Sequence, residues 1–410
     1  MKKLFVMLLV VVLVFALVIA AVAGRPETME AESAGEAAEE ITGEIAPAEA
    51  AEAPAPVDPA DVEIQELDYD AIYALHAGDE VVMTVAGEDI TWDMYFESIK
   101  SNGLQIEDYF RQMGAYYGES ATWEGSLGDD SGMTFAEYPV TAAEDTLSHY
   151  AAVDALAKEK GITLSEENEA AAAPEQLAAD ALGEGTTVEE LEAALDEQLH
   201  LTLPTYKRMF EVNCLYNQLR VDEFGEKGEL ADEADVIAYL QEANYTSANH
   251  ILLMTMDPNT GDTLDEAAAA EKKAKADEIY AELSAITDTD KLVERFKELK
   301  AEYCEDTGSE AFPDGYTYIP GTMVAEFEDT VNALEDYGLS EPVESAYGYH
   351  IILRMPLSGD CLIYAGGMPD TARYHYAVDT FTDSFQQYME ENAPVYADGF
   401  EPIDLLNYIK

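Results

Sequence analysis

Regular spacing of apolar and polar positions begins near Val81 and continues through the first half of the chain. The stretch "VVMTVAGEDITWDMYFESI" fits a short strand, a glycine turn and a helix with Thr91 at its N-cap. Residues 141–161 keep apolar side chains on one helix face and close with a glycine. Thr187 opens a further helix through a capping box. These patterns predict a mostly helical domain over residues 81–243.

From residue 246 the pattern changes to buried-strand runs that alternate with helices. "ANHILLMTM", "GYTYI", "EPVES" and "GYHIILRM" are predicted strands, and three helical stretches lie between them. The order β-α-α-β-α-β-β predicts an α+β domain with a mixed four-stranded sheet over residues 246–356. The segment 357–410 carries one long amphipathic helix, which we expect to complete the helical domain. The fold class is therefore α+β, a helical domain with an inserted mixed-sheet domain.

The chain opens with Met1-Lys2-Lys3 and an unbroken apolar run, Leu4–Ala23. This arrangement predicts a signal peptide or a membrane anchor over residues 1–24. A small-x-small motif precedes Gly24, as at a cleavage site, but the run is also long enough to cross a bilayer. Both alternatives stay open, and both place the remainder of the chain outside the cytoplasm, because lysines favour the inner side.

Residues 25–80 are rich in Ala, Glu and Pro and carry charge of mainly one sign. Such a segment offers few side chains that could form a core. We therefore expect an acidic, disordered linker over this range.

The whole chain of 410 residues has 21 Lys and Arg against 85 Asp and Glu, a formal net charge of −64. This charge argues against a nucleic-acid partner, because binding to phosphates requires clustered basic side chains. The 3 cysteines are too few and too scattered for a disulfide framework or a zinc site. No metal and no cofactor are expected.

Candidate chemistry gathers in the predicted α+β domain. His250 lies in its first strand and His350 in its last, so the two imidazoles can meet on one face of a sheet. Asp306 follows the second helix, and Met323 and Phe327 are spaced to share one face of the third. From the residues alone, structural histidines and an apolar core stripe are the simpler interpretation.

The segment Ala248–Leu353 resembles the parvulin-type peptidyl-prolyl cis/trans isomerases. The resemblance is carried by "ANHILL", "LKAEYCED", "GTMVAEFEDTVNAL" and "LSEPVESAYGYHIIL". The opening "VVMTVAGEDIT" is similar to that of exported parvulin foldases, in which a C-terminal helix completes an N-terminal helical chaperone domain. The family catalyses rotation about X–Pro amides without a cofactor.

The resemblance implies a role for each candidate residue. It assigns catalytic positions to His250, Asp306 and His350, and substrate-binding positions to Met323, Phe327, Ser345 and Tyr347. One departure stands before the second strand, where "FPDGYTYIPG" replaces a Gly-Gly-Asp-Leu-Gly-like turn. Either Tyr316 or Tyr318 could then supply the apolar pocket residue expected there. The loop after the first strand has no basic residue, which disfavours phosphorylated substrates.

These observations together predict an extracytoplasmic peptidyl-prolyl isomerase that assists the folding of exported proteins. Its partners would be unfolded or partly folded exported polypeptides that contain X–Pro. The protein would be secreted, or anchored to the cell membrane through residues 4–23. The alternative is a holdase chaperone of the same architecture with a catalytically silent parvulin domain. A structural surface stalk would fit the linker, but it explains neither the paired histidines nor the "GYHII" motif.

Overall fold

The structure, a computed structural model, describes residues 58–128, 131–257, 260–364 and 369–410. The predicted signal peptide or anchor and residues 25–57 of the predicted linker lie outside the described residues. Among the helices within the described ranges, none is both long and apolar enough to cross a membrane.

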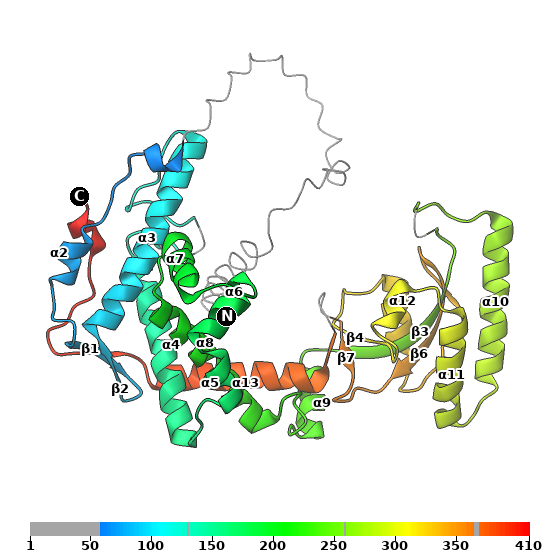
Figure 1. The fold of residues 1–410 in the computed structure, drawn as a ribbon. Coiled ribbons are helices and arrows are strands. Elements are labelled where there is room, and N and C mark those ends of the chain that lie inside the picture. Colours follow the sequence, from blue (N-terminus) through cyan, green and yellow to red (C-terminus); the bar gives the residue numbers. More distant parts are fainter. Residues whose placement is uncertain (1–57, 129–130, 258–259, 365–368) are drawn as a thin grey trace, which may run out of the picture. The chain divides into compact units, whose positions relative to one another are not determined.

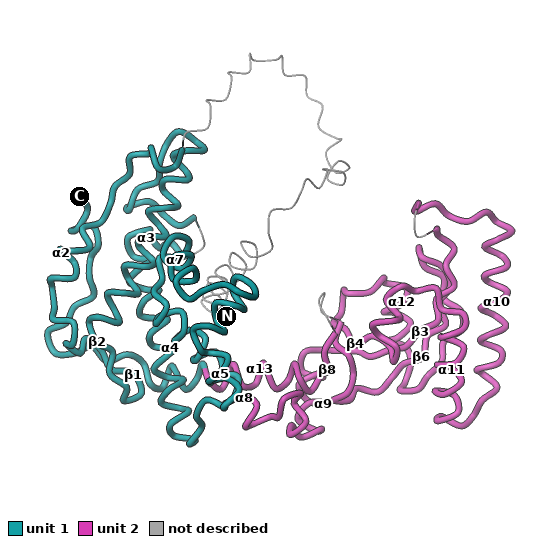
Figure 2. The backbone as a smooth tube through the Cα atoms, in the orientation of Figure 1, with its two compact units in different colours: residues 1–219, 386–410 teal, residues 220–385 magenta. Residues whose placement is uncertain are grey.

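The chain divides into two compact units, which Figure 2 shows in different colours. The first contains residues 1–219, as far as they are described, together with 386–410, and the second contains residues 220–385. The predicted domain limits near residues 243 and 357 lie within the second unit, and they stay predictions.

The first unit is mainly helical, as Figure 1 shows. Its helical elements are η1 (Pro59–Asp61), α2 (Tyr69–Tyr73), α3 (Trp92–Tyr117), α4 (Tyr138–Lys160), α5 (Glu166–Ala171), α6 (Pro174–Leu182), α7 (Val188–Leu199), most of α8 (Leu203–Phe224) and η3 (Leu405–Tyr408). Helix α3 ends at Gly118, which takes a left-handed conformation at φ 75°. At α7 both hydrogen bonds of the predicted capping box are present.

A three-stranded antiparallel sheet in the order β2-β1-β9 joins both ends of the first unit. Its strands are β1 (Val81–Val85), β2 (Glu88–Thr91) and β9 (Val395–Tyr396). The core beside it contains Trp92 and Trp123, together with Phe400 and Leu405 from the C-terminal segment. The end of the chain is thus part of this helical unit.

Residues 58–80 are not the disordered linker that composition suggests. Leu67 and Ile72 are buried in the core of the first unit. The backbone N–H of Leu67 donates to the buried carboxylate of Glu107 on α3 at 2.8 Å. The linker prediction is therefore corrected for this part of the range, because its apolar side chains pack in the core and its backbone is hydrogen-bonded to the rest of the first unit.

The second unit contains a six-stranded mixed sheet in the order β5-β6-β3-β4-β7-β8, in which only the β4–β7 pair is parallel. Its strands are β3 (Thr246–Met254), β4 (Tyr316–Tyr318), β5 (Val343–Glu344), β6 (Gly348–Met355), β7 (Leu362–Ile363) and β8 (Asp370–Thr371). Its helical elements are α9 (Glu233–Glu242), α10 (Glu266–Ser284), α11 (Thr289–Tyr303), η2 (Thr307–Glu310), α12 (Ala325–Ala333) and most of α13 (Ala372–Glu391).

The α+β fold class is confirmed, and all four predicted strands are present. The prediction missed β7 and β8, each only two residues long and without alternating apolar positions, whereas the equally short β5 was predicted from the "EPVES" run. Helices α10 and α11 cover one face of the sheet, where Ile251 and Ile351 are buried, and α12 covers the other (Figure 1). On the α12 face, Ala248 and Ile352 pack in one cluster with Phe327 and Val331.

We expect Phe400→Ala to lower the free energy of unfolding of the first unit by about 3 kcal/mol, because it leaves a cavity in the core. The ring is 8% exposed and lies 5.6 Å from that of Tyr95. Both tryptophans of the chain belong to this unit, so their fluorescence during urea unfolding reports on it alone.

The matched control is Val395→Ala, on the same C-terminal segment but 68% exposed. It should change the free energy of unfolding by less than about 0.5 kcal/mol. Equal effects of the two substitutions would show that the C-terminal segment does not stabilise the helical core.

Candidate functional site

His250 and His350 lie on the same face of the sheet. On adjacent strands, His350 pairs directly with Leu252, which stands two residues after His250 on β3. Residues two apart on a strand share a face, and so do directly paired residues, so both imidazoles point toward α12. Their ring centroids are 5.3 Å apart, and both side chains are buried.

The carboxylate of Asp306, which follows α11, connects this pair to the rest of the unit. Its Oδ2 lies 3.0 Å from Nε2 of His250 and accepts a hydrogen bond from the Tyr316 hydroxyl at 2.5 Å. Its Oδ1 accepts the N–H of Gly308 at 3.0 Å. Burial alone would raise the pKa of Asp306, but these three hydrogen bonds outweigh it and hold the pKa well below its usual range.

The pKa values of the two histidines are shifted in opposite directions. Burial opposes a charge on His250, but Asp306 and Cys304 together outweigh it and raise the pKa of this imidazole. Burial, with repulsion from His250, lowers the pKa of His350 to about 3. These shifts favour an ion pair between Asp306 and His250 beside a neutral His350. Nε2 of His350 lies 2.7 Å from the Ser345 hydroxyl.

Phe327 forms an apolar wall beside both imidazoles. Its ring centroid lies 5.3 Å from that of His250 and 5.7 Å from that of His350, in edge-on geometry. Met323 packs against the same cluster. The predicted placement of Met323 on the helix is wrong, because α12 begins at Ala325. Instead, the Glu328 carboxylate accepts the N–H of Met323 at 2.8 Å and fixes the loop ahead of the helix.

Ser345 and Tyr347 lie at the rim, in the turn between β5 and β6. The Ser345 hydroxyl accepts the N–H of Tyr347 at 3.1 Å and also contacts His350. The Tyr347 side chain is 44% exposed. The structure thus brings His250, Asp306, His350, Phe327 and Ser345 into direct contact and places Met323 and Tyr347 at the margins. Their roles in catalysis and binding stay predictions.

Tyr316 and Tyr318 both face this side of the sheet. The ring of Tyr316 lies 5.6 Å from that of His250, and the ring of Tyr318 lies 6.1 Å from that of Phe327. Tyr316 also bonds to Asp306, so of the two it has the closer connection to the histidines. Among the described residues, no group of His, Cys, Asp and Glu side chains is arranged to hold a metal ion.

Lys300 is a supporting residue that the sequence analysis did not identify. Its side chain is buried on α11, and Nζ donates to Oδ1 of Asn249 at 2.8 Å and to the carbonyl oxygen of Phe312 at 2.9 Å. A third bond, of 3.2 Å, goes to the carbonyl of Pro313. Lys300 therefore ties the unusual turn before β4 to strand β3. Its spacing of four from the buried Phe296 was the available signal.

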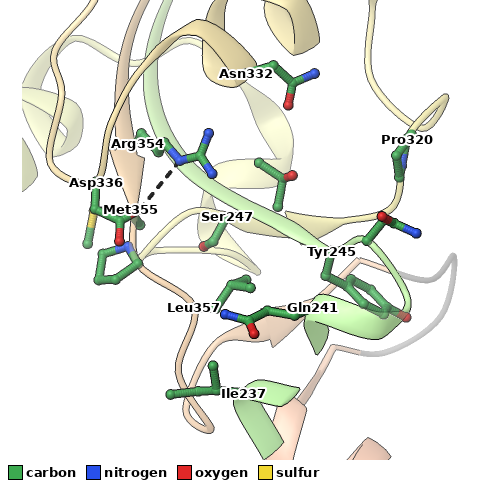
Figure 3. Close-up of a pocket in the computed structure, with 13 residues that line it drawn as sticks. Ile237, Gln241, Tyr245, Ser247, Pro320, Asn332, Asp336, Arg354, Met355 and Leu357 are labelled. Atoms are coloured by element: carbon green, nitrogen blue, oxygen red, sulfur yellow. Dashed lines mark ion pairs between the residues drawn. The ribbon is translucent and has the colours of Figure 1, made fainter. Parts of the chain in front are cut away.

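A pocket of about 610 Å³ lies elsewhere in the second unit (Figure 3). Its lining includes Gln241 and Tyr245 from the α9–β3 region, Asn332 from α12, and Arg354 from β6. Arg354 Nε lies 3.4 Å from Asp336 Oδ1. None of the predicted site residues lines this pocket, so it is separate from the histidine pair.

Comparison with known proteins places the α+β part in a family. Residues 250–355 match the family described as "Rotamase: PPIC-type PPIASE domain". All five contacting residues of the site fall within this range. The chain therefore contains a parvulin-type peptidyl-prolyl isomerase domain, as the resemblance implies.

The relatives cover short segments. The chain is 50% identical to "Foldase protein PrsA 1" of Bacillus cereus over 58 residues, 14% of this chain and 20% of that protein. It is 48% identical to "Chaperone SurA" of Chromohalobacter salexigens over 61 residues, 14% of each. These segments span at most a fifth of either relative. The crystal structure of PrsA from Bacillus subtilis aligns with 66% of this chain and 91% of its own at 17% identity, with a TM-score of 0.26.

We expect Lys300→Met to destabilise the second unit by about 2–4 kcal/mol, because it leaves buried acceptors unpaired. Hydrogen exchange of the β3 and β4 amides, followed by mass spectrometry, measures the change. The control is Lys297→Met. Lys297 lies on the same helix and its ammonium group pairs with Asp314 in the turn before β4, but its side chain is 48% exposed. The control should cost less than about 1 kcal/mol. Equal protection in both variants would contradict a structural role for Lys300.

We expect the His350 imidazole to stay neutral from pH 8 to about pH 4. The unfolded chain takes up this proton near pH 6.5, whereas the folded unit does so only near pH 3. Between these values the free energy of unfolding therefore falls as the pH falls, by up to about 1.4 kcal/mol per pH unit. Long-range ¹H–¹⁵N spectra of the histidine rings, assigned with His350→Gln, follow the titration. A midpoint near pH 6.5 would contradict the prediction.

Proposed function

We propose that the protein is an extracytoplasmic peptidyl-prolyl cis/trans isomerase that assists the folding of exported proteins. The observation that carries the proposal is the contact of Phe327 with the paired His250 and His350 inside a PPIC-type domain. The segments that are 50% and 48% identical to PrsA and SurA proteins support a role as a foldase. The N-terminal apolar run supports export, by a cleaved signal peptide or by a membrane anchor through residues 4–23.

The protein needs to stabilise the transition state of this reaction only modestly. Rotation about an X–Pro amide has a barrier of about 20 kcal/mol, because the twisted amide loses its resonance. No bond to hydrogen breaks, so no general acid or base is required. A 10³-fold acceleration requires only about 4 kcal/mol of differential stabilisation. An apolar wall that removes water from the proline ring favours the twisted state, in which charge separation across the amide is reduced.

We assign the roles in this site as follows. Phe327, with Met323, would hold the proline ring, and neutral His350 and the hydroxyl of Ser345 would hydrogen-bond the carbonyls that flank it. His250 and Asp306 would act through the local field and keep the wall in place. Tyr347 would contact the substrate at the rim. The partners are unfolded or partly folded exported polypeptides that contain X–Pro.

One observation favours the alternative, a holdase with a silent isomerase domain. Phe327 is only 2% exposed, and His250 and His350 are also buried, so a proline ring reaches this wall only after local displacement of side chains. Comparing the rate of X–Pro exchange with the suppression of aggregation distinguishes the two functions. A silent domain gives no acceleration of X–Pro exchange while the protein still suppresses aggregation of an unfolded client.

We expect Phe327→Ala to lower kcat/KM on an X–Pro peptide about 30- to 150-fold, since the side chain contributes about 2–3 kcal/mol by burial. The rate is measured by NMR exchange on the purified protein, after circular dichroism and a thermal melt have shown an intact fold. Asp306→Asn should have a smaller effect, because no proton is transferred and the asparagine oxygen can still accept one of the hydrogen bonds that Asp306 receives. Asp329→Ala, an exposed change on the same helix, serves as the control and should leave the rate unchanged. A folded Phe327→Ala protein that is as fast as the parent would refute the assignment.

A further inference from the structure

A continuous row of four rings crosses the α12 face of the sheet. The aromatic row consists of His350 on β6, His250 on β3, Tyr316 on β4, and Tyr364 immediately after β7. Successive ring centroids are separated by 5.3 Å, 5.6 Å and 5.5 Å. The row thus leads from the proposed catalytic pair to a residue outside the PPIC-type match, which ends at residue 355.

The strand register places Tyr364 on this face. Thr317 on β4 pairs in parallel with Ile363 on β7, so these two residues share one face of the sheet. The residue that follows each of them, Tyr318 or Tyr364, points to the other face. Tyr364 therefore shares the side of Tyr316 and Tyr318. Its backbone N–H donates to the carbonyl of Thr317 at 2.8 Å, which fixes the position of its Cα relative to β4.

Tyr364 differs from the rest of the aromatic row in exposure. The first three rings are at most 7% exposed, whereas Tyr364 is 40% exposed. Two buried rings support it from within, since Phe312 lies 5.4 Å and Tyr316 lies 5.5 Å from it, both edge-on. An aromatic side chain held in this way loses little conformational entropy when it contacts a ligand. Aromatic pairs also add stabilisation beyond the buried area alone.

We infer that Tyr364 is a substrate-binding residue that contacts an aromatic side chain of the client polypeptide close to its X–Pro bond. This inference rests on the proposed function of the same site. Two steps of the row, each under 6 Å, separate Tyr364 from His250. An extended chain advances about 3.3 Å per residue, so the aromatic residue would stand about three positions from the proline. The occupant is thus an extended peptide with proline and an aromatic residue at this spacing.

The test is a series of peptides with one Ala–Pro bond, in which a single Phe is moved through the four positions on either side. We expect one position, about three residues from the proline, to raise kcat/KM about three- to tenfold over the all-alanine peptide. The gain should lie in KM rather than in kcat, because the contact is the same in the ground state and the transition state. Tyr364→Ala should abolish this gain, and Tyr364→Phe should retain it.

Tyr337→Ala is the matched control, because Tyr337 is also 40% exposed in the same unit but stands outside the aromatic row. It should keep the full gain. An equal gain in Tyr364→Ala and in the parent, or no gain at any position, would overturn the inference. If no peptide is turned over, the proposed function fails, and the Phe series is then compared by binding affinity. Tighter binding at one position that is lost in Tyr364→Ala would support the subsite even then.

Discussion

The carboxylate of Asp306 is the interaction on which the geometry of the site depends. It joins three segments, namely His250 on β3, which is distant in sequence, and the nearer Tyr316 on β4 and backbone of Gly308 in η2. A half-buried carboxylate is favoured where its lone pairs are satisfied, so the three partners fix one another's positions. Burial, with repulsion from His250, keeps His350 neutral, so that its imidazole can share a hydrogen bond with the Ser345 hydroxyl. The neutral imidazole and the hydroxyl together are suited to an uncharged amide.

The buried ammonium group of Lys300 also supports this arrangement. Lys300 supplies donors to Asn249 on β3 and to the turn before β4, and that turn determines where Tyr316 begins its strand. The chain carries a net charge of −64, yet in the second unit Asp306 contacts His250, and the Lys300 ammonium is bonded to neutral oxygens of Asn249, Phe312 and Pro313. The excess negative charge therefore bears on solvation and self-repulsion of the protein rather than on the chemistry of the site.

Sequence patterns were sufficient for the main strands and for the histidine pair. The run around His250 and the "GYHIILRM" run are long and apolar, and period-two alternation determines which side chains share a face. Other features depend on contacts that leave no period. The position of Met323 ahead of α12 depends on hydrogen bonds to Glu328, and the order of residues 58–80 depends on Leu67 and Ile72 reaching a distant core. Burial of Lys300 likewise requires acceptors from β3 and from a turn, which helix periodicity alone does not reveal.

Strands β7 and β8, which the sequence did not predict, extend the sheet of the isomerase domain. β4 is only three residues long and would be an edge strand if the sheet ended there. Edge strands expose unpaired backbone groups, but β7 pairs with β4 and the N–H of Tyr364 satisfies the carbonyl of Thr317. All three side chains of β4 are buried, including that of Tyr316. The segment beyond residue 355 thus covers the strand that carries Tyr316, so the range that matches the family is shorter than the sheet that supports the site.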